Sequence, residues 1–490
     1  MVSGLENQRK YTLKSKIGYG LGDVANGGAF ALLGLLYLNF LVSVEGMNPA
    51  LAGLVVMIAR IWDAFTDPLM GVISDRTRSK FGRRRVFLLF GSIPLFLSFV
   101  LLWYSFGITD PFGKFIYYTI MYMLFSTAIA ITAVPYNALL PDMVKGYKER
   151  TGYITVRMLV SNIAATIAVT TPAFILGAEA YRNTTDFLRM GIVFGLFFSI
   201  PLVVCFFLTW ENREQTVQTR PGLGAIISEF ASSFNNRAFR QYLGIFVFGQ
   251  VATDIGTAVT AFWLADVMVR GDFLMIASGI VMVAALSMLP INNWISKKYG
   301  KHYPIFIMLP IRVVALAGSF FMTANSPLAT LILVCLATGI GAGSISYVAW
   351  VILPDMPDTN ELIYGARNAG VFGAIATFAR NFTSGISIFL VGIMLNLFGY
   401  VESTAGVMIE QSPLALMGVR ITFAIIPLVL TVVTILIGFR FVLTKKGHQH
   451  IRQAIDYKTA HNKPIEDETV IVACEKISGH DFSNIWVGKH

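Results

Sequence analysis

Long apolar stretches alternate with short polar segments along most of the chain. Each stretch holds about 20 or more residues, the length that an α-helix needs to cross a bilayer. Inside lipid the backbone has no water to bind, so stretches of this length predict helices rather than irregular structure. We expect twelve helices, over residues 17–42, 50–74, 86–106, 115–140, 152–178, 187–210, 239–265, 272–293, 304–323, 327–353, 370–398 and 415–443.

The longest polar interruption divides the predicted helices into two sets of six. We expect one half at residues 17–210, a cytoplasmic linker at 211–238 and a second half at 239–443. A polar segment precedes them at residues 1–16, and a polar tail with five of the six histidines follows at 444–490. The sequence therefore predicts an all-α polytopic membrane protein with two six-helix halves.

Two short motifs recur at the same place in each half. Leu-Pro-Asp-Met stands at residues 140–143, at the end of the fourth predicted helix, and at 353–356, at the end of the tenth. Phe-Gly-Arg at 81–83 follows the second helix, and Tyr-Gly-Lys at 299–301 follows the eighth. The offsets, 213 and 218 residues, are nearly equal and indicate duplication. Transporters that alternate between two open states are built from such repeats, with the solute site near the midplane.

The charge distribution supports a membrane location. Hydrophobic residues make up 55% of the chain and charged residues 13%, against about a quarter in an average soluble protein. The net charge of +10 comes from lysines and arginines in alternate short loops, above all residues 76–85, and not from a nucleic-acid-binding patch. This pattern predicts that both termini are cytoplasmic, in a bacterial inner membrane. The three cysteines, Cys205, Cys335 and Cys474, are too scattered to predict a disulfide framework or a metal site.

Ionisable residues in the second predicted helix are the strongest functional signal. Arg60, Asp63 and Asp67 are spaced so that they share one helix face. Charges within membrane spans are expensive and usually functional, and two neighbouring carboxylates repel unless a cation or a proton intervenes. We expect Asp63 and Asp67 to bind the coupling cation, with the Thr66 hydroxyl as a further oxygen. The alternative is that Arg60 neutralises one carboxylate while the other faces a cytoplasmic vestibule.

Further polar residues inside predicted helices are candidates for solute binding. Asp23 either lines the pathway or pairs with a nearby base, and Asp254 lies at a similar depth in the seventh helix. Arg157 either binds the solute or pairs with Asp142. Arg380 lies deep in its helix and needs a partner, either a carboxylate of the second helix or an anionic solute. Aromatic candidates could stack on a sugar ring, although such residues more often pack. The full set of solute-binding candidates is Asp23, Asn26, Tyr136, Asn137, Arg157, Trp350, Arg380 and Asn381.

The sequence lacks the common catalytic and nucleotide-binding motifs. It has no phosphate-binding glycine loop, nucleophile elbow or metalloprotease helix motif, which disfavours ATP-driven transport and an enzyme. We expect no metal and no cofactor other than a coupling ion, H⁺ or Na⁺. No histidine falls inside a predicted helix, so a proton relay would rest on carboxylates.

The run from Ala59 to Gly71 closely resembles the signature of the glycoside–pentoside–hexuronide:cation symporters. The resemblance continues at residues 19–23, 75–83 and 135–141 and covers residues 14 to about 443. It implies a major facilitator fold and cation-coupled uptake of a glycoside, pentoside or hexuronide. It also implies that Asp63 and Asp67 are the cation carboxylates.

The chain departs from melibiose permease-like members of that family at several positions. Thr66 stands where they have asparagine, which favours H⁺ over Na⁺. Gly27 and Ala133 stand where they have sugar-binding carboxylates, whereas Arg157 and Arg380 keep basic positions. Losing acids while keeping bases suits an anionic solute such as a uronide, or a neutral glycoside bound in another orientation.

The sequence thus predicts a monomeric symporter whose halves rock around a midplane site. Its partners would be a sugar or uronide, the coupling cation and membrane lipid, with no nucleic acid. Asp75, Arg76 and Arg83 are expected to form a cytoplasmic gating contact in one state only. The alternatives are a lipid or lysolipid transporter of the same fold and a non-transporting sensor that signals through the tail. Removing the tail is expected to abolish function in a sensor and to spare uptake in a symporter.

Overall fold

The computed structural model of the protein describes residues 12–144, 147–176, 184–211, 233–365, 369–402 and 410–489. Within these residues, ten helical stretches are long and apolar enough to cross a membrane, and two shorter apolar helices bring the set to twelve. The expected all-α fold with two six-helix halves is confirmed. Most of the predicted N-terminal segment at 1–16 and of the linker at 211–238 lies outside the described residues.

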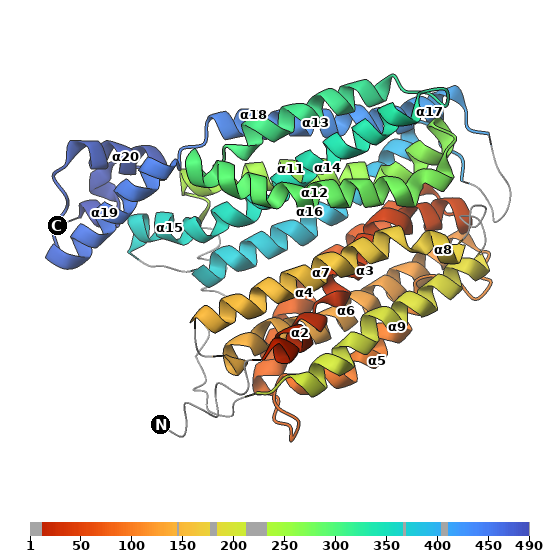
Figure 1. The fold of residues 1–490 in the computed structure, drawn as a ribbon, viewed down its shortest axis with the longest axis horizontal. Coiled ribbons are helices and arrows are strands. Elements are labelled where there is room, and N and C mark those ends of the chain that lie inside the picture. Colours follow the sequence, from red (N-terminus) through yellow and green to blue (C-terminus); the bar gives the residue numbers. More distant parts are fainter. Residues whose placement is uncertain are drawn as a thin grey trace.

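Each half is a bundle of long helices joined by short turns (Figure 1). The N-terminal half contains α2 (Leu13–Leu21), α3 (Val24–Asn39), α4 (Pro49–Arg76), α5 (Arg85–Leu101), α6 (Pro111–Met143), α7 (Tyr147–Thr170), α8 (Pro172–Leu176) and α9 (Thr184–Leu208). The C-terminal half contains α11 (Arg237–Phe262), α12 (Leu274–Lys298), α13 (Pro304–Phe320), α14 (Leu328–Ile352), α15 (Met356–Tyr364), α16 (Ala369–Leu397), α17 (Pro413–Arg420) and α18 (Ile426–Phe439).

The first and the tenth helices differ from the sequence-based expectation, and the fifth is divided at Thr171 into α7 and α8. The first is interrupted at Gly22 and Asp23, whose N–H groups donate to carbonyls three residues back, so that a tight turn separates α2 from α3. The tenth does not end at its Leu-Pro-Asp-Met motif. A 3₁₀ turn, Leu353–Asp355, carries the chain into α15, because a proline at the start of a helical turn loses no necessary hydrogen bond.

The two halves meet at one end and separate at the other. In Figure 1 they diverge toward the end that carries the tail helices, here called the tail end, and converge at the opposite, far end. α4 packs on α16, α7 on α12 and α3 on α11. At the far end, Asn48 Nδ2 donates to Asn396 Oδ1 over 2.8 Å across the halves. Toward the tail end, by contrast, Phe65 of α4 is 66% exposed and Phe378 of α16 is 42% exposed.

Glycines bring α4 and α16 into backbone contact near the far end. A Cβ atom at Gly392 would lie 2.2 Å from the carbonyl oxygen of Pro49, and one at Gly53 would lie 2.9 Å from the Cα atom of Phe389. Small residues permit this close approach between membrane helices. The far-end contact therefore depends on the absence of side chains at these positions.

The repeated motifs meet inside each half. Arg83 Nη2 lies 3.2 Å from Asp142 Oδ2 in the N-terminal half, and Lys301 Nζ lies 2.7 Å from Asp355 Oδ2 in the C-terminal half. The preceding glycines, Gly82 and Gly300, have φ angles of 104° and 134°, in a region that side chains disfavour. The same turn and the same ion pair at matching places support the duplication that the sequence indicates.

The tail folds onto the C-terminal half. Helices α19 (Lys445–His461) and α20 (Glu468–Ser478) lie beside α15 (Figure 1), and Ile451, Ile455 and Ile477 join an apolar core with the tail ends of α11 and α14.

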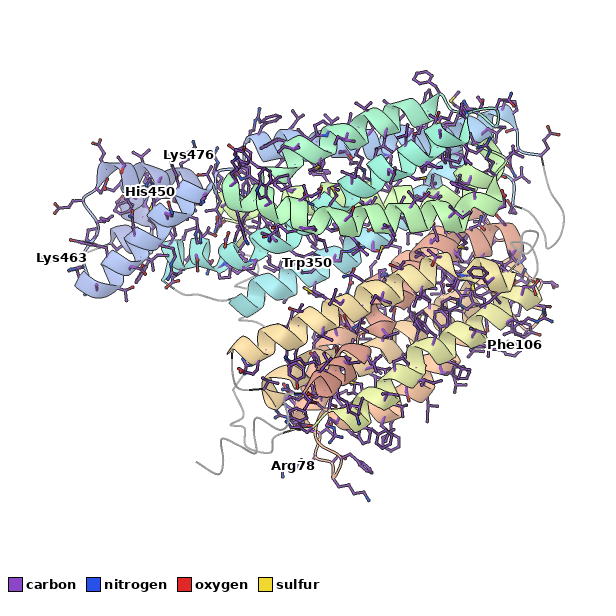
Figure 2. The ribbon with its side chains drawn as sticks, in the orientation of Figure 1. Arg78, Phe106, Trp350, His450, Lys463 and Lys476 are labelled. Atoms are coloured by element: carbon purple, nitrogen blue, oxygen red, sulfur yellow. The ribbon has the colours of Figure 1, made fainter. Side chains whose placement is uncertain are left out.

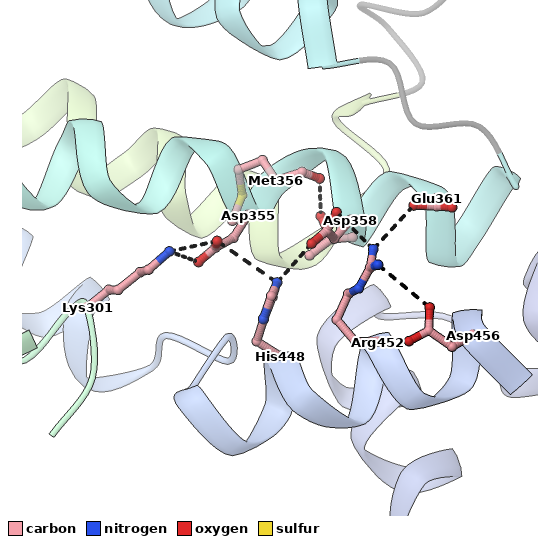
Figure 3. A network of polar contacts seen from close by, with 9 residues as sticks. Lys301, Asp355, Met356, Asp358, Glu361, His448, Arg452 and Asp456 are labelled. Carbon is pink, nitrogen blue, oxygen red and sulfur yellow. Dashed lines mark hydrogen bonds and ion pairs between the residues drawn. The ribbon is translucent and has the colours of Figure 1, made fainter. Parts of the chain in front are cut away.

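Ion pairs surround this apolar contact (Figure 3). His448 Nε2 lies 3.0 Å from Asp358 Oδ2, and Arg452 approaches Asp358 at 3.5 Å and Glu361 at 3.9 Å. Asp355 joins the same network at 3.9 Å from His448. The tail is therefore a folded extension of one half and not a loose polar segment.

Candidate functional site

The second membrane helix carries the candidate cation site. Arg60 and Asp63 of α4 are 6% and 5% exposed, and Arg60 Nη1 lies 3.4 Å from Asp63 Oδ2. The guanidinium also lies 4.1 Å from the centre of the Phe30 ring of α3. A charge in the membrane interior needs a partner, and in this geometry the partner of Arg60 is Asp63.

Asp67 is left without such a partner. It is half-buried one turn beyond Asp63, and it makes no ion pair or hydrogen bond with any other residue that the structure describes. The charges of Asp63 and Arg60 act on it from within the same helix. The Thr66 hydroxyl donates to its own helix, to the carbonyl of Trp62 or Asp63, and keeps its oxygen as an acceptor. Arg60 thus neutralises one carboxylate, as the alternative interpretation expected, and Asp67 keeps a charge that a cation or a proton could balance.

Asp23 and Arg157 form an ion pair across the N-terminal half. Arg157 Nη2 of α7 lies 2.9 Å from Asp23 Oδ1, and Asn26 Nδ2 donates to the same oxygen over 3.2 Å. Of the alternatives for Arg157, the pairing with Asp142 is wrong, because Asp142 instead binds Arg83 and Arg84 at 3.2 and 3.0 Å. Asp23 pairs with a base, as one of its two alternatives proposed.

The ring of Tyr136 packs against the guanidinium of this ion pair. Its ring lies 4.9 Å from the Arg157 guanidinium and stacks on Tyr19 at 4.7 Å. Its hydroxyl donates to the Tyr19 carbonyl over 2.8 Å, and the side chain is fully buried. Tyr136 therefore positions Arg157 in this structure rather than offering a free face for stacking on a sugar.

Arg380 finds a carboxylate within its own half. Its Nη1 and Nη2 atoms lie 2.6 and 3.0 Å from the two oxygens of Asp254 in α11, a bidentate pair. Of the two alternatives for Arg380, the pairing with a carboxylate of the second helix is wrong, and the binding of an anionic solute stays a prediction. The sequence analysis placed Asp254 in the seventh helix at a depth similar to that of Asp23, but it did not identify Arg380 as the partner of Asp254.

Arg312 is a further charged residue that the sequence analysis did not single out. It is 3% exposed in α13, and its guanidinium donates to Thr253 Oγ1 at 2.9 Å and to the Ala252 carbonyl at 3.0 Å. Gly341 leaves space for it, since a Cβ there would lie 2.5 Å from Arg312 Cδ. The charge of Asp254 also acts on Arg312. The available signal was a single arginine well inside the apolar stretch 304–323.

The remaining solute candidates are spread over several surfaces. Trp350 is 48% exposed on α14, where it meets Phe246 edge-on at 6.0 Å, and it faces the N-terminal half in Figure 2. Asn137 is exposed on α6, and Asn381 is half-buried beside Arg380. Asn381 follows Arg380 in the sequence and Asn137 follows Tyr136, but among the described residues neither asparagine nor Trp350 hydrogen bonds to either ion pair.

The candidate gating loop closes on its own half. Arg83 reaches Asp142 at 3.2 Å and Glu211 at 3.6 Å, while Asp75 lies 3.3 Å from Arg84. Arg76 is exposed. None of these ion pairs reaches the C-terminal half. The loop therefore contacts its own half at the tail end, where the two halves are apart.

Two pseudo-symmetric six-helix halves, each with an ion pair inside its helix bundle, define a membrane transporter of the major facilitator class, and not an enzyme. Residues 18–445 match the family described as MFS/sugar transport protein, so the chain belongs to that family. The fold and family implied by the resemblance are confirmed.

Several curated proteins are similar along most of the chain. An uncharacterized symporter, YnaJ, of Bacillus subtilis (strain 168) is 29% identical, over 94% of this chain and 99% of its own. A glucuronide carrier protein homolog of Escherichia coli (strain K12) is 25% identical, over 90% and 94%. A sodium-dependent lysophosphatidylcholine symporter of Gallus gallus is 22% identical, over 81% and 80%.

The fold also matches a solved transporter. A bacterial homolog of the human lysosomal transporter Spinster, in an inward-facing and unoccupied conformation, superposes with a TM-score of 0.62 over 89% of this chain and 98% of its own. The two sequences are only 11% identical, so this similarity concerns the fold alone.

Proposed function

We propose that the protein is a cation-coupled symporter that imports a glycoside, pentoside or hexuronide by alternating access, as a single chain. The observation that carries this proposal is the unpaired Asp67 beside Asp63, on α4 of the N-terminal half, which packs on α16 of the other half. A carboxylate with no counter-ion in a membrane span has a strong reason to bind H⁺ or Na⁺. The names of similar proteins, among them a symporter and a glucuronide carrier homolog, support the same class of function.

The tail end is, on this proposal, the cytoplasmic end. The basic loop at residues 76–85 lies there, together with Lys297, Lys298 and Lys301. Lysine and arginine favour the cytoplasmic side of a membrane. The halves meet at the far end and are apart at the tail end, so the conformation corresponds to one that opens inward.

The charges of the C-terminal half favour an anionic sugar. Arg380 pairs with Asp254, whereas Arg312 makes no ion pair among the described residues and feels only the charge of the same carboxylate, so two guanidiniums lie near one carboxylate here. The carboxylate of a hexuronide would balance that charge through a charge-assisted hydrogen bond. We therefore favour a uronide or a similar anionic sugar over a neutral glycoside.

Uptake into vesicles of the purified protein tests this proposal. The probes are a labelled glucuronide and its uncharged glucoside, with an imposed H⁺ or Na⁺ gradient. We expect gradient-driven accumulation of the glucuronide, reduced about tenfold or more in Asp67→Asn. Asp272→Asn, which changes an exposed carboxylate between α11 and α12, is the matched control. Equal accumulation by Asp67→Asn and the wild type would contradict a coupling role for Asp67, and preference for the glucoside would contradict the anionic substrate.

A lysolipid is the second candidate solute. It is favoured by the similarity to the lysophosphatidylcholine symporter and by apolar side chains that are exposed on the facing helices near the tail end, namely Phe65, Leu69, Phe378 and Phe382. Addition of lysophosphatidylcholine to the same uptake assay separates the two. Strong competition together with accumulation of the lysolipid would replace the sugar as the substrate.

A further inference from the structure

A buried row of hydroxyl groups runs along one face of α6. Tyr118, Tyr122 and Ser126 are spaced four residues apart, so their side chains stand one above another over about 12 Å. All three are at most 1% exposed. We call these three residues the hydroxyl row.

The row joins two carboxylates. At its outer end the Tyr118 hydroxyl faces Glu45, which is 4% exposed and lies 3.2 Å from Lys114 Nζ near the far end. At its inner end Ser126 faces the carboxylate of Asp63 in the candidate cation site. The hydroxyl row therefore spans the N-terminal half from the far end to the carboxylate that we expect to bind the coupling ion.

The row is rich in hydroxyl groups that lack a hydrogen bond. The hydroxyl of Tyr118 lies near Ser105 and Glu45 and that of Ser126 near Asp63, but neither of these hydroxyls, nor that of Tyr37 in α3, makes a hydrogen bond of normal geometry with the residues described. The Tyr37 ring lies 5.2 Å from that of Tyr122 and 6.5 Å from that of Tyr118, so the three tyrosines form one cluster at the outer part of the row. Buried polar groups are almost always satisfied, and where the protein offers no partner a buried water does so.

We propose that the hydroxyl row and Tyr37 hold a file of water molecules that carries the coupling proton between Glu45 and Asp63. The inference rests on the proposed symport and specifies H⁺ as its ion. Glu45 gives up a proton and becomes a carboxylate, each oxygen of the row accepts one proton as it gives up another, and Asp63 becomes a neutral acid. A proton can pass along such a file by exchange of bonds while the oxygens stay in place, whereas Na⁺ would itself have to move through the row and would need its own ligands.

Arg60 is placed to prevent a leak through this file. Its guanidinium lies beside the Tyr122 hydroxyl and also holds Asp63, so it stands where the row meets the cation site. A fixed positive charge repels protons, a device that membrane channels use for the same purpose. In the present conformation, which is open at the tail end, Arg60 keeps the far-end path closed. In the conformation that is open at the far end, separation of Arg60 from Asp63 would open this proton path.

Radiolytic labelling of the purified whole protein tests for the water. A brief X-ray pulse converts bound water to hydroxyl radicals, which modify the side chains beside it. We expect modification of Tyr37, Tyr118 and Tyr122 despite their burial. Tyr153 is the matched control, since it is equally buried but its hydroxyl already bonds to Ser15 Oγ at 2.6 Å. Labelling of the three tyrosines as slow as that of Tyr153 would show a dry row and overturn the inference.

Transport by Tyr122→Phe tests the proton path. The change removes one hydroxyl and keeps the ring. We expect accumulation driven by a pH gradient to fall about tenfold or more, while exchange of labelled for unlabelled solute, which needs no net proton transfer, is unchanged. Thr119→Val is the matched control, because the Thr119 hydroxyl lies off the row and donates to the Phe115 carbonyl.

The outcomes separate this inference from the proposed function. Normal pH-driven accumulation by Tyr122→Phe, or uptake driven by Na⁺ alone, would overturn the proton path and leave symport intact. Absence of any solute flux in the wild type would overturn symport and, with it, the proton path. A loss of exchange equal to the loss of accumulation would assign Tyr122 to solute movement and contradict its role in proton transfer.

Discussion

The two ion pairs near the site occupy equivalent places in the two halves. Asp23 and Arg157 join the first and fifth membrane helices, and Asp254 and Arg380 join the seventh and eleventh. The halves differ in what surrounds the pairs. Arg312 adds a positive charge beside Asp254, whereas Asn26 adds a neutral amide beside Asp23. On the function proposed above, the C-terminal half would bind the anionic solute and the N-terminal half the cation.

Asp254→Asn releases Arg380 from its internal partner. We expect the half-saturating concentration of a glucuronide to fall about tenfold, because the freed guanidinium can bind the solute carboxylate instead. The concentration dependence of solute exchange measures this, since it does not require coupling. Asp23→Asn is the matched control and should bring no such selective gain. Weaker binding of the glucuronide by Asp254→Asn would show that Asp254 orients Arg380 rather than competes for it.

The sequence identified most charged residues of the site but not their partners. Asp63, Asp67 and Arg60 could be grouped because they share one helix, where spacing alone determines the face. The partner of Arg380 is 126 residues away, and only the packing of α11 on α16 brings the two together. Arg312 went unnoticed because it has no charged residue near it in the sequence, and its hydrogen bonds go to a threonine and a backbone carbonyl.

At the scale of helices, the tail changes the earlier expectation about its removal. The sequence suggested a polar segment that a symporter could lose without effect. In the structure, Ile451, Ile455 and Ile477 are buried in a core that the C-terminal half shares. These apolar residues recur at helical spacing over only a short stretch with many charged residues. The polar composition of the tail therefore hid the buried helix face.

Truncation after Leu443 should therefore destabilise the transporter itself. Loss of several buried apolar side chains, each contributing about 1.5–3 kcal/mol, is expected to lower the unfolding temperature on the order of 10 °C. Thermal unfolding of the purified protein, followed by size-exclusion chromatography after heating, measures the change. A truncated chain as stable as the wild type would show that the tail docks only weakly.

Cys474 reports whether the tail is docked. Burial raises the pKa of its thiol to about 12, so almost no reactive thiolate is present at neutral pH. We expect a polar maleimide to leave Cys474 unmodified in the folded protein. Arg452→Glu reverses the charge that faces Asp358 and Glu361 and should increase labelling as the thiol pKa returns toward its ordinary value. Mass spectrometry of the labelled peptide measures it, and rapid labelling in the wild type would contradict the docked arrangement.

Helix ends were predicted less well than helices. The membrane helices were recognised from apolar length, which depends on the bilayer alone. The continuation through Pro354 into α15 was not predicted, because proline usually marks a helix end and here begins a new turn. Contact with the tail stabilises that extra turn, and no local signal indicates such a contact.

At the scale of the whole molecule, the far-end contact defines the state that the structure shows. Asn48 and Asn396 hydrogen bond across the halves there. The double variant Asn48→Cys, Asn396→Cys should form a disulfide on oxidation and hold the far end closed. Because alternating access requires this end to open, uptake should fall to the level of empty vesicles and return after reduction.

The two single variants are the controls, since neither can form this crosslink. Uptake that persists in the oxidised double variant, with the disulfide verified by mass spectrometry, would rule out opening at the far end. The native cysteines do not complicate the assay, because Cys205, Cys335 and Cys474 are all buried.

The folded tail also bears on how the protein is made. Residues that complete the core of the C-terminal half, among them Val470 and Val487, lie beyond α18, the last helix that enters the membrane. Insertion is therefore finished while this half still exposes apolar surface, and its folding ends only when the later residues emerge from the ribosome. A premature stop codon after α18 would leave every membrane helix in place and still give a protein that cellular quality control treats as unfinished.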